Sequence, residues 1–411
     1  MNKILIICIL TMLSINSHAT SFEDFFEDKT LRIDYIFAGN DKHQDIYVDQ
    51  LTMLPKWYGK RQRLDAVPLK GNGQIIVRSQ IDGRVIYRHS FSTLFQEWLA
   101  TAESKRTQKS FENVFLIPWP KYPIDVTVEL YDNHGHVTTN MNHSIDPTDI
   151  LIRRGGEIGI TPYSILQQAA DTSRCIRIAY VAEGYQTDEM STFLDDCKAA
   201  TASLFAHEPF GGLRDRFNIV AVMSPSADSG TSEPSKGIWK DTALGSHFDT
   251  FYSDRYLTTL HLKRLHDVLA GIPYEHIIIL VNTEHYGGGG IYNSYNLSYT
   301  RGRHFKPVVV HEFGHSFGGL GDEYDYGNDA PTYFADTEPW EPNLTTRHDF
   351  GSKWEKLQQQ GKAGLVEGGG YMKHGVWRAF DNCRMRTNEE PEFCLVCREA
   401  LTRLIEFYTK P

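Results

Sequence analysis

Residues 308–324 read VVVHEFGHSFGGLGDEY and contain the motif H-E-x-x-H. Residues four apart lie on one face of a helix, so His311 and His315 can direct two imidazoles at one metal ion. Glu312 lies beside them, within reach of a water at that ion, and is the candidate general base. Zn²⁺ is the expected ion because it binds imidazole readily and a catalytic site keeps one position for water.

The residues around the motif favour a buried helix that leads into a metal site. Three valines precede His311, Pro307 suits a first helical turn, and a glycine cluster follows His315. The alternative is that the two histidines are incidental surface residues on a helix. The local context favours the metal site.

A third ligand is needed, and the spacing after His315 bears on it. Thermolysin-like enzymes take a glutamate from a second helix, whereas metzincins turn sharply in H-E-x-x-H-x-x-G-x-x-H, some with Asp in the last place. Gly318 falls at the turn, but the last place is Gly321, and Asp322 comes one residue late. Gly319 can absorb that residue because glycine adopts positive φ readily. We expect Asp322 as third ligand, with Glu323 second. A role for Asp322 in only holding a histidine N–H is the alternative.

The first 19 residues have the pattern of a secretory signal peptide. One lysine precedes an apolar run from residue 4 to 15, and Ser17 and Ala19 are the small residues that precede a cleavage site. The run is too short to span a bilayer, and no second apolar segment of membrane length follows. We expect an exported chain (periplasmic, cell-surface or extracellular) without membrane insertion.

The overall composition narrows the possible partners. The formal net charge of −10 argues against nucleic acid. With 41% hydrophobic residues, the chain has material for two globular cores. No pattern in the sequence indicates an oligomeric state.

An odd number of cysteines follows the signal peptide: Cys175, Cys197, Cys383, Cys394 and Cys397. In an exported protein at least one thiol is then free or intermolecular. The last two form a C-x-x-C, for which a redox role would need a thioredoxin-like setting and a structural zinc site would need a second pair. A disulfide from one of them to Cys383 is the preferred interpretation.

Residues 20–150 are expected to form an antiparallel β-sandwich. Short runs of alternating polarity, broken by Asp-Gly and Asn-His-Gly turns, are typical of such strands, and only residues 92–104 have a helical pattern. The expected strands are residues 31–37, 74–78, 85–87, 113–117 and 125–131. No catalytic grouping shows here, and by analogy such a domain positions an enzyme or binds its target.

Residues 151–174 are expected to be a linker, and residues 175–411 an α/β domain. Strands at 176–181, 217–223 and 276–282 alternate with helices at 187–205 and 251–270, which predicts a mainly parallel or mixed sheet. Gly287–Gly290 lack the G-K-[S/T] ending of a phosphate loop. We interpret them as a flexible entry to an edge strand, on which an extended peptide could lie.

Several motifs together resemble peptidase family M64, which is named for an immunoglobulin A peptidase. They are HEFGHSFGGLGDEY (311–324), NCRMR (382–386), FCLVC (393–397), VAEGY (181–185), EPF (208–210) and EPN (341–343). The resemblance covers nearly the whole mature chain. It implies a metzincin-like zinc peptidase with His311, His315 and Asp322 as ligands, Glu312 as base and Met385 in the Met-turn beneath the metal. The extra residue before Asp322 departs from the general metzincin pattern.

The predicted fold is therefore a multidomain α+β fold, with a β-sandwich followed by a metzincin-like α/β zinc peptidase domain. The predicted function is that of a secreted zinc endopeptidase acting on a protein or peptide substrate. Immunoglobulin A as substrate follows from the family name alone. Tyr371 and Arg386 are candidates for holding the oxyanion. The alternatives are a zinc exopeptidase or amidase, and a non-catalytic module that binds glycan or protein on a degenerate peptidase scaffold.

Overall fold

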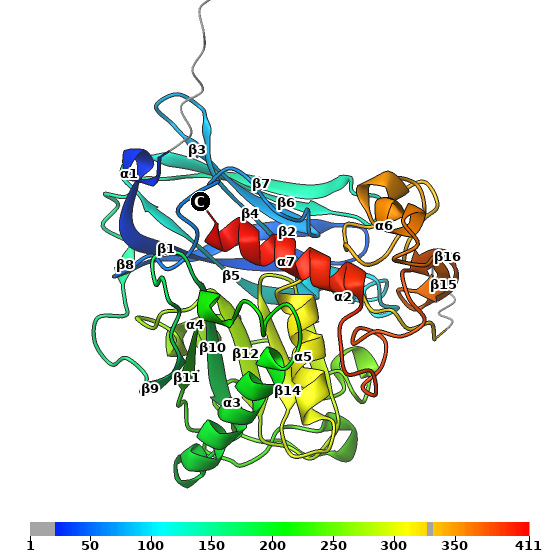
Figure 1. Cartoon of the computed structure of the whole chain (residues 1–411). Coiled ribbons are helices and arrows are strands. Elements are labelled where there is room, and N and C mark those ends of the chain that lie inside the picture. The colour runs from blue at the N-terminus through cyan, green and yellow to red at the C-terminus, as the bar shows by residue number, and fades with distance from the viewer. Residues whose placement is uncertain (1–20, 327–331, 411) are drawn as a thin grey trace, which may run out of the picture.

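Figure 1 shows the computed structural model of the chain, in which residues 21–326 and 332–410 are described. The signal peptide expected at residues 1–19 lies outside the described residues. The strands of the N-terminal part (blue to cyan) lie above a mixed sheet (green to yellow), and the last helix (red) crosses the molecule between them.

The N-terminal part consists of two four-stranded sheets, ordered β5-β1-β2-β8 and β4-β3-β6-β7. All neighbours pair antiparallel except β2 and β8. Its elements are α1 (Phe22–Phe25), β1 (Phe26–Gly39), β2 (Gln44–Leu54), β3 (Gly73–Ser79), β4 (Val85–Phe91), α2 (Leu94–Leu99), β5 (Lys109–Pro120), β6 (Ile124–Tyr131), β7 (Val137–Ile145) and β8 (Arg153–Arg154).

Alternation along the strands explains why the two sheets pack face to face. In β6 every second side chain is buried, because successive side chains of a strand point to opposite faces. Ile33 of β1 and Val126 of β6 both lie in the core between the sheets. Tyr35 Oη in β1 is 2.6 Å from His143 Nε2 in β7, which joins the sheets across that core. The expected β-sandwich is formed.

The C-terminal part is built on a six-stranded sheet ordered β13-β14-β12-β10-β11-β9. The four inner strands are parallel, and the edge strands β9 and β13 are antiparallel to their neighbours. Its elements are β9 (Tyr163–Gln167), β10 (Ile176–Glu183), α3 (Met190–Phe205), β11 (Phe217–Val222), α4 (Leu262–Val268), β12 (His276–Val281), β13 (Gly288–Ile291), β14 (Tyr295–Tyr299), α5 (Phe305–Ser316), α6 (Glu355–Gln359), β15 (Val366–Gly369), β16 (Met372–Arg378) and α7 (Leu395–Thr409).

The mixed sheet and the edge strand at the glycine run agree with the sequence prediction, but two details differ. The stretch 151–174 contributes a strand to each part: β8 to the sandwich and β9 to the mixed sheet. The helix predicted at 251–270 was wrong, since only α4 is α-helical there. His247 and Thr258 exchange two backbone hydrogen bonds, and Phe251 and Tyr252 have positive φ. This folded-back segment buries Leu257 but leaves Tyr252 and Leu260 exposed.

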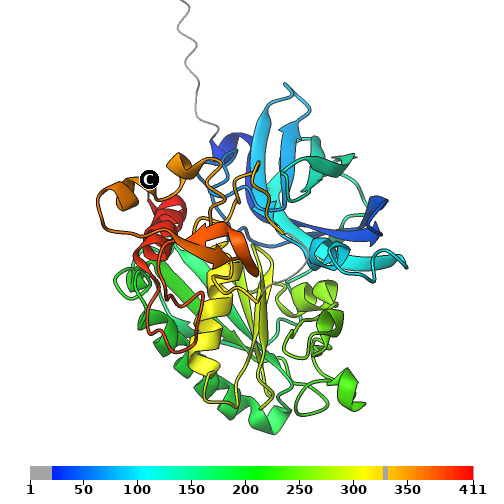
Figure 2. The same cartoon turned by 90° about the vertical axis from the view of Figure 1, so that its right-hand side faces the viewer.

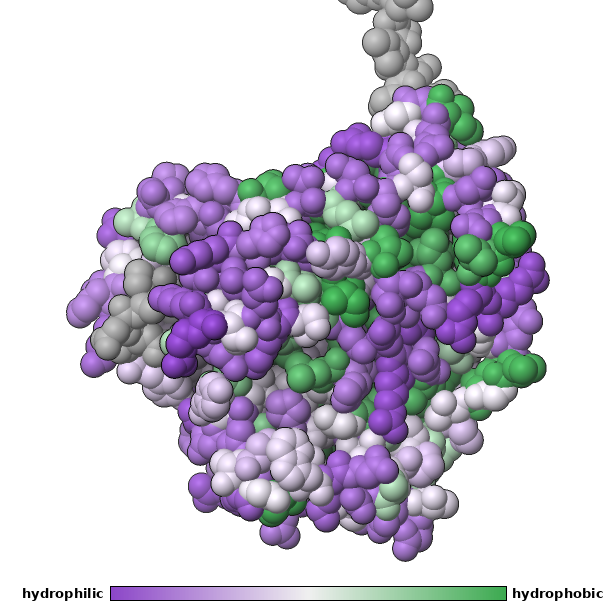
Figure 3. Space-filling view, turned by 180° about the vertical axis from the view of Figure 1, so that it is seen from behind, coloured by the Kyte–Doolittle hydropathy of each residue, from purple (hydrophilic) through white to green (hydrophobic). Residues whose placement is uncertain are grey.

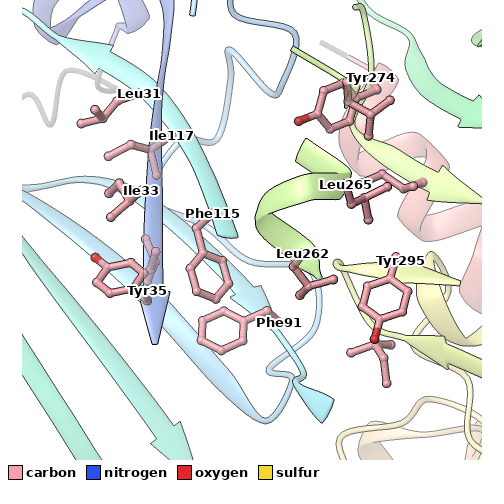
Figure 4. Close-up of a cluster of buried hydrophobic side chains, with 14 of the residues drawn as sticks. Leu31, Ile33, Tyr35, Phe91, Phe115, Ile117, Leu262, Leu265, Tyr274 and Tyr295 are labelled. Carbon is pink, nitrogen blue, oxygen red and sulfur yellow. The ribbon is translucent and has the colours of Figure 1, made fainter. Parts of the chain in front are cut away.

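The two parts share one hydrophobic core. Alternate residues of β10 point to opposite faces: Tyr180 packs with α3, α5 and α7, whereas Val181 packs toward α4 and the sandwich. Figure 4 shows Phe115 beside Phe91 within the sandwich, with Leu262 and Leu265 of α4 in the neighbouring part of the same cluster. Arg32 is 3% exposed, and its guanidinium hydrogen-bonds Asp34 and, across the junction, Asp267. The sandwich is therefore fixed to the C-terminal part.

The outer surface is mainly hydrophilic on the face opposite Figure 1, with apolar side chains showing between polar ones (Figure 3). Over the part of the chain that the structure describes, none of the helices combines the length and the apolar character needed to cross a membrane.

Candidate metal centre

Helix α5 carries both histidines of the H-E-x-x-H motif on one face. Phe313 and Val310 are buried in the core on its other side, which sets the rotation of the helix about its axis. His311 and His315 lie one turn apart, and their Nε2 atoms are 3.0 Å from each other. The spacing of four residues thus brings the two imidazoles together, as the helical periodicity requires.

The loop after α5 brings Asp322 back to the two histidines. Leu320 N donates to Gly314 O at the helix end, and Gly319 takes a positive φ of 58°. Asp322 Oδ1 is 3.1 Å from His311 Nε2 and 3.2 Å from His315 Nε2. Glu323, the second choice as ligand, points elsewhere, because its carboxylate accepts from Asn343 and Cys397. The structure therefore brings Asp322, and not Glu323, to the histidines.

Hydrogen bonds to the far side of each ring orient the imidazoles. His311 Nδ1 donates to Arg384 O at 3.0 Å, and His315 Nδ1 donates to Leu320 O at 2.6 Å. This tautomer leaves both Nε2 lone pairs free, as metal-binding histidines require. Asp322 Oδ1 is buried and lacks a hydrogen-bond donor among the described residues.

The three converging atoms fit a zinc ion. Tetrahedral zinc with bonds of about 2.0–2.1 Å separates neighbouring ligand atoms by about 3.3 Å. The three observed separations lie within a few tenths of an ångström of that value. A metal ion would satisfy all three lone pairs at once.

The charges of His315 and Asp322 shift one another's pKa. Burial by itself would lower the pKa of His315, but the adjacent Asp322 carboxylate outweighs it and raises that pKa to about 9. Burial would raise the pKa of Asp322, and the two imidazoles instead hold it well below its usual range. Protons and a metal ion compete for the same atoms, so metal binding at this site weakens as pH falls.

Glu312 lies between the two histidines in sequence and faces the edge strand β13. Burial raises its pKa, while His311 and His315 oppose that shift. A Cβ on Gly288 would lie 2.5 Å from Glu312 Oε1, and one on Gly290 would lie 2.6 Å from Glu312 O. The glycines of β13 therefore allow the strand to pass directly over α5 and leave room for the carboxylate.

We expect Gly288→Ala to lower kcat about 100-fold, because a catalytic group displaced by about 1 Å loses roughly that factor. The added methyl group must push the Glu312 carboxylate from its place, while the three converging atoms are untouched. Steady-state kinetics on a peptide substrate and metal content measure the two effects. Gly351→Ala is the matched control, since its Cβ would have no neighbour nearer than 3.6 Å. An unchanged kcat in Gly288→Ala would contradict this role of the glycine.

Tyr371, named above as a candidate for the oxyanion, contacts the carboxylate of Asp322. Its hydroxyl donates to Asp322 Oδ2. It lies in the turn of the β15–β16 hairpin (orange), which Figure 2 shows beside α5 (yellow). Gly370 N donates to Asp322 O at 2.7 Å and so fixes the hairpin to the ligand loop. Arg386, the other candidate, donates to Glu323 O at 2.7 Å and lies 3.6 Å from Asp325.

Tyr371→Phe is expected to weaken metal binding about 10–100-fold, which is the usual effect of removing a hydrogen bond to a metal ligand. Competition with a chromogenic chelator measures the affinity. Tyr333→Phe is the control, because Tyr333 also donates to a carboxylate, that of Glu341. Equal affinities for the two variants would show that the Tyr371 hydroxyl does not orient Asp322.

Two residues near the site were not anticipated from the sequence. Glu97 belongs to α2 of the sandwich, and Tyr256 donates a hydrogen bond to its Oε2. Burial raises the pKa of Glu97 to about 7, and the charges of the His315, Asp322 and Glu312 group also act on it. Tyr256 also lies against Gly289, so the sandwich places a carboxyl group beside the strand that passes over Glu312. The only sequence signal was a helical pattern between strands.

Two further motif residues, Glu183 and Met385, are buried and hold neighbouring segments in place. Glu183, at the end of β10, is fully buried and accepts hydrogen bonds from Leu244 N and Ser246 N, which fixes that loop. Met385 is fully buried against Gly314 of α5, where an added Cβ would lie 2.7 Å from its Sδ.

An H-E-x-x-H helix on a mixed sheet, joined by a carboxylate from the following loop, is typical of metal-dependent hydrolases. The sequence profile described as IgA Peptidase M64 matches residues 165–363, and the profile described as Peptidase M64 N-terminus matches residues 21–142. The chain belongs to peptidase family M64, and this membership makes it a peptidase. No curated protein matches the chain.

Proposed function

We propose that this protein is an exported zinc-dependent endopeptidase with His311, His315 and Asp322 as ligands and Glu312 as general base. The convergence of two imidazole nitrogens and one buried carboxylate oxygen beside Glu312 carries this proposal. The edge strand β13, which passes over the same helix, supports a substrate chain bound nearby.

Glu312 would accept a proton from the attacking water and return it to the leaving amine. Its raised pKa suits this exchange, since a base works best when its pKa lies closer to the operating pH. Zinc, when bound, would supply a Lewis acid that polarises the peptide carbonyl and lowers the pKa of water toward about 7. Tyr371 would hold Asp322 in place during this chemistry.

The outer side of β13 limits where a substrate can pair. Leu257 N donates to Gly288 O, and Gly288 N donates to Arg255 O. The backbone groups of Gly288 that point away from β14 are therefore already hydrogen-bonded. A substrate that extends the sheet would have to pair beyond Gly288. The edge is thus partly occupied by the segment that carries Tyr256.

This covered edge and Glu97 favour a second candidate function, that of an aminopeptidase. A carboxyl group beside the strand that passes over Glu312 could hold the free amino terminus of a peptide. Two peptides of one sequence, with a free and an acetylated amino terminus, distinguish the candidates. An endopeptidase cleaves both internally, whereas an aminopeptidase removes the first residue of the free peptide alone.

Incubation of the purified protein with immunoglobulin A, mucin and casein tests the main proposal. We expect internal cleavage of at least one protein, loss of cleavage after a chelator removes the metal, and recovery when zinc is added back. Mass spectrometry of the products gives the cleaved bonds. Cleavage that persists in the chelated, metal-free protein would refute the metal-dependent mechanism.

A further inference from the structure

A second group of metal-binding side chains lies next to the candidate centre and takes no part in the mechanism above. It consists of Glu323, Cys383, Cys394 and Cys397, whose four donor atoms all lie within 4.8 Å of one another. The disulfide expected from Cys383 is not formed, since all five cysteines of the described chain are free thiols. A structural zinc site at the C-x-x-C needs two ligands besides Cys394 and Cys397. Cys383 and Glu323 would provide them.

Burial raises the pKa of Glu323 well above its usual range, and a bound cation would let its carboxylate stay ionised. Its side chain is fully buried, and Oε1 accepts from Asn343 Nδ2 at 2.9 Å. Oε2 has no hydrogen-bond partner in the described part of the chain. Without a cation this buried carboxyl group is favoured in its protonated form, whereas a bound metal ion would replace that proton and pair with the carboxylate.

Two distances within the group match those of a tetrahedral zinc site, and all four donor atoms lie within 4.8 Å of one another. Zinc with Zn–S bonds of about 2.3 Å separates two sulfurs by about 3.8 Å and a sulfur from an oxygen by about 3.5 Å. Cys383 Sγ and Cys397 Sγ are 3.7 Å apart, and Cys397 Sγ is 3.4 Å from Glu323 Oε1. A disulfide would require about 2.05 Å between the sulfurs.

The secondary structure also favours thiolates here. Cys394 is the N-cap residue of α7, and Cys397 lies in the first turn, where the free amides and the helix dipole stabilise negative charge. Cys394 N donates to Cys383 Sγ at 3.2 Å, a hydrogen bond that suits a metal-bound sulfur.

We propose that Glu323, Cys383, Cys394 and Cys397 bind a second zinc ion with a structural role. Four protein ligands close the coordination sphere, which leaves no position for water or substrate. The three thiols and the carboxyl group of Glu323 release their protons to solvent when the ion binds.

This second ion would stabilise the two chain segments that hold Asp322 and His311 in the candidate metal centre. Glu323 directly follows Asp322, and its N donates to Met385 O at 2.9 Å. Arg384, which follows Cys383, provides the carbonyl that holds His311 Nδ1. The ion would therefore link the loop that carries Asp322 to the start of helix α7. It would also link the segment that holds His311 to that helix.

Metal analysis of the full chain tests this inference separately from the peptidase mechanism. We expect two zinc ions per chain in the wild type and one in each of His315→Ala and Cys397→Ser. Cys175→Ser, which changes a cysteine outside the group, should keep both ions. After exchange for cobalt, a thiolate-to-cobalt charge-transfer band should appear in the wild type and in His315→Ala, because only the cysteine site contains sulfur.

The wild-type measurements decide the question even if Cys397→Ser fails to fold. A single zinc ion per chain, together with non-reducing peptide mapping that finds a disulfide at Cys383, would overturn the proposal. Absence of the charge-transfer band from a cobalt-loaded chain whose thiols are all reduced would also overturn it. Failure of the peptidase assays alone would leave the metal count unaffected.

Discussion

Glu312→Gln should lower kcat by about 10²–10⁴-fold, the range that a positioned general base contributes. Glutamine keeps the shape of the side chain beside Gly288 but cannot accept the proton of the attacking water. Because His311, His315 and Asp322 are unchanged, metal content should equal that of the wild type. Single-turnover cleavage of a peptide and metal analysis measure these two quantities.

Stability provides a further check on this variant. Burial raises the pKa of Glu312 in the metal-free protein, so its ionised form costs folding free energy at pH values above that pKa. Removing the charge should therefore leave the Tm of the metal-free chain at neutral pH unchanged or higher. Glu284→Gln, at an exposed position, is the matched control. A glutamine variant with wild-type kcat would eliminate Glu312 as the base.

Asp322→Ala should weaken metal binding by more than about 100-fold, the upper limit for loss of a supporting hydrogen bond alone. The variant leaves only two imidazoles at the centre, since Glu323 is directed toward the cysteines. Cleavage activity should be lost in parallel. Metal affinity, measured by competition with a chelator, is the deciding quantity.

The size of this loss distinguishes the two roles considered for Asp322. Removal of a ligand weakens metal binding by more than about 100-fold. Removal of a residue that only orients a histidine weakens it by about 10–100-fold. Asp325→Asn is the control in the same loop, because Asp325 faces Arg386 rather than the histidines. A loss of less than about tenfold for Asp322→Ala would exclude it as a ligand.

The junction between the two parts bears on how the sandwich takes part in function. An interface that continues the hydrophobic core and contains the hydrogen bonds of the buried Arg32 to Asp267 and Lys263 O does not open at little cost. Glu97 and the centre on α5 are therefore held at a constant separation. The sandwich is packed against the C-terminal part and not tethered to it by a linker.

The local parts of the fold were predictable because they depend on neighbours in sequence. The apolar strands β10, β11 and β12 have hydrophobic runs bounded by polar turns, and the mixed sheet followed from their alternation with helices. The prediction of a helix at 251–270 was wrong because it depended on periodicity alone. Leu257, Leu262 and Leu265 are buried, but periodicity alone does not distinguish a helix from a folded-back segment.

Within the site, the sequence by itself determined the H-E-x-x-H helix, because its geometry depends only on a spacing of four residues. The sequence also placed Asp322 among few candidates, but only the reversal at Gly319 decided which carboxylate meets the histidines. Tertiary structure alone brought Glu97, Tyr371 and the three cysteines to this region. These residues are far apart in the chain, and their proximity depends on the packing of the sandwich, the β15–β16 hairpin and α7, for which no local pattern exists.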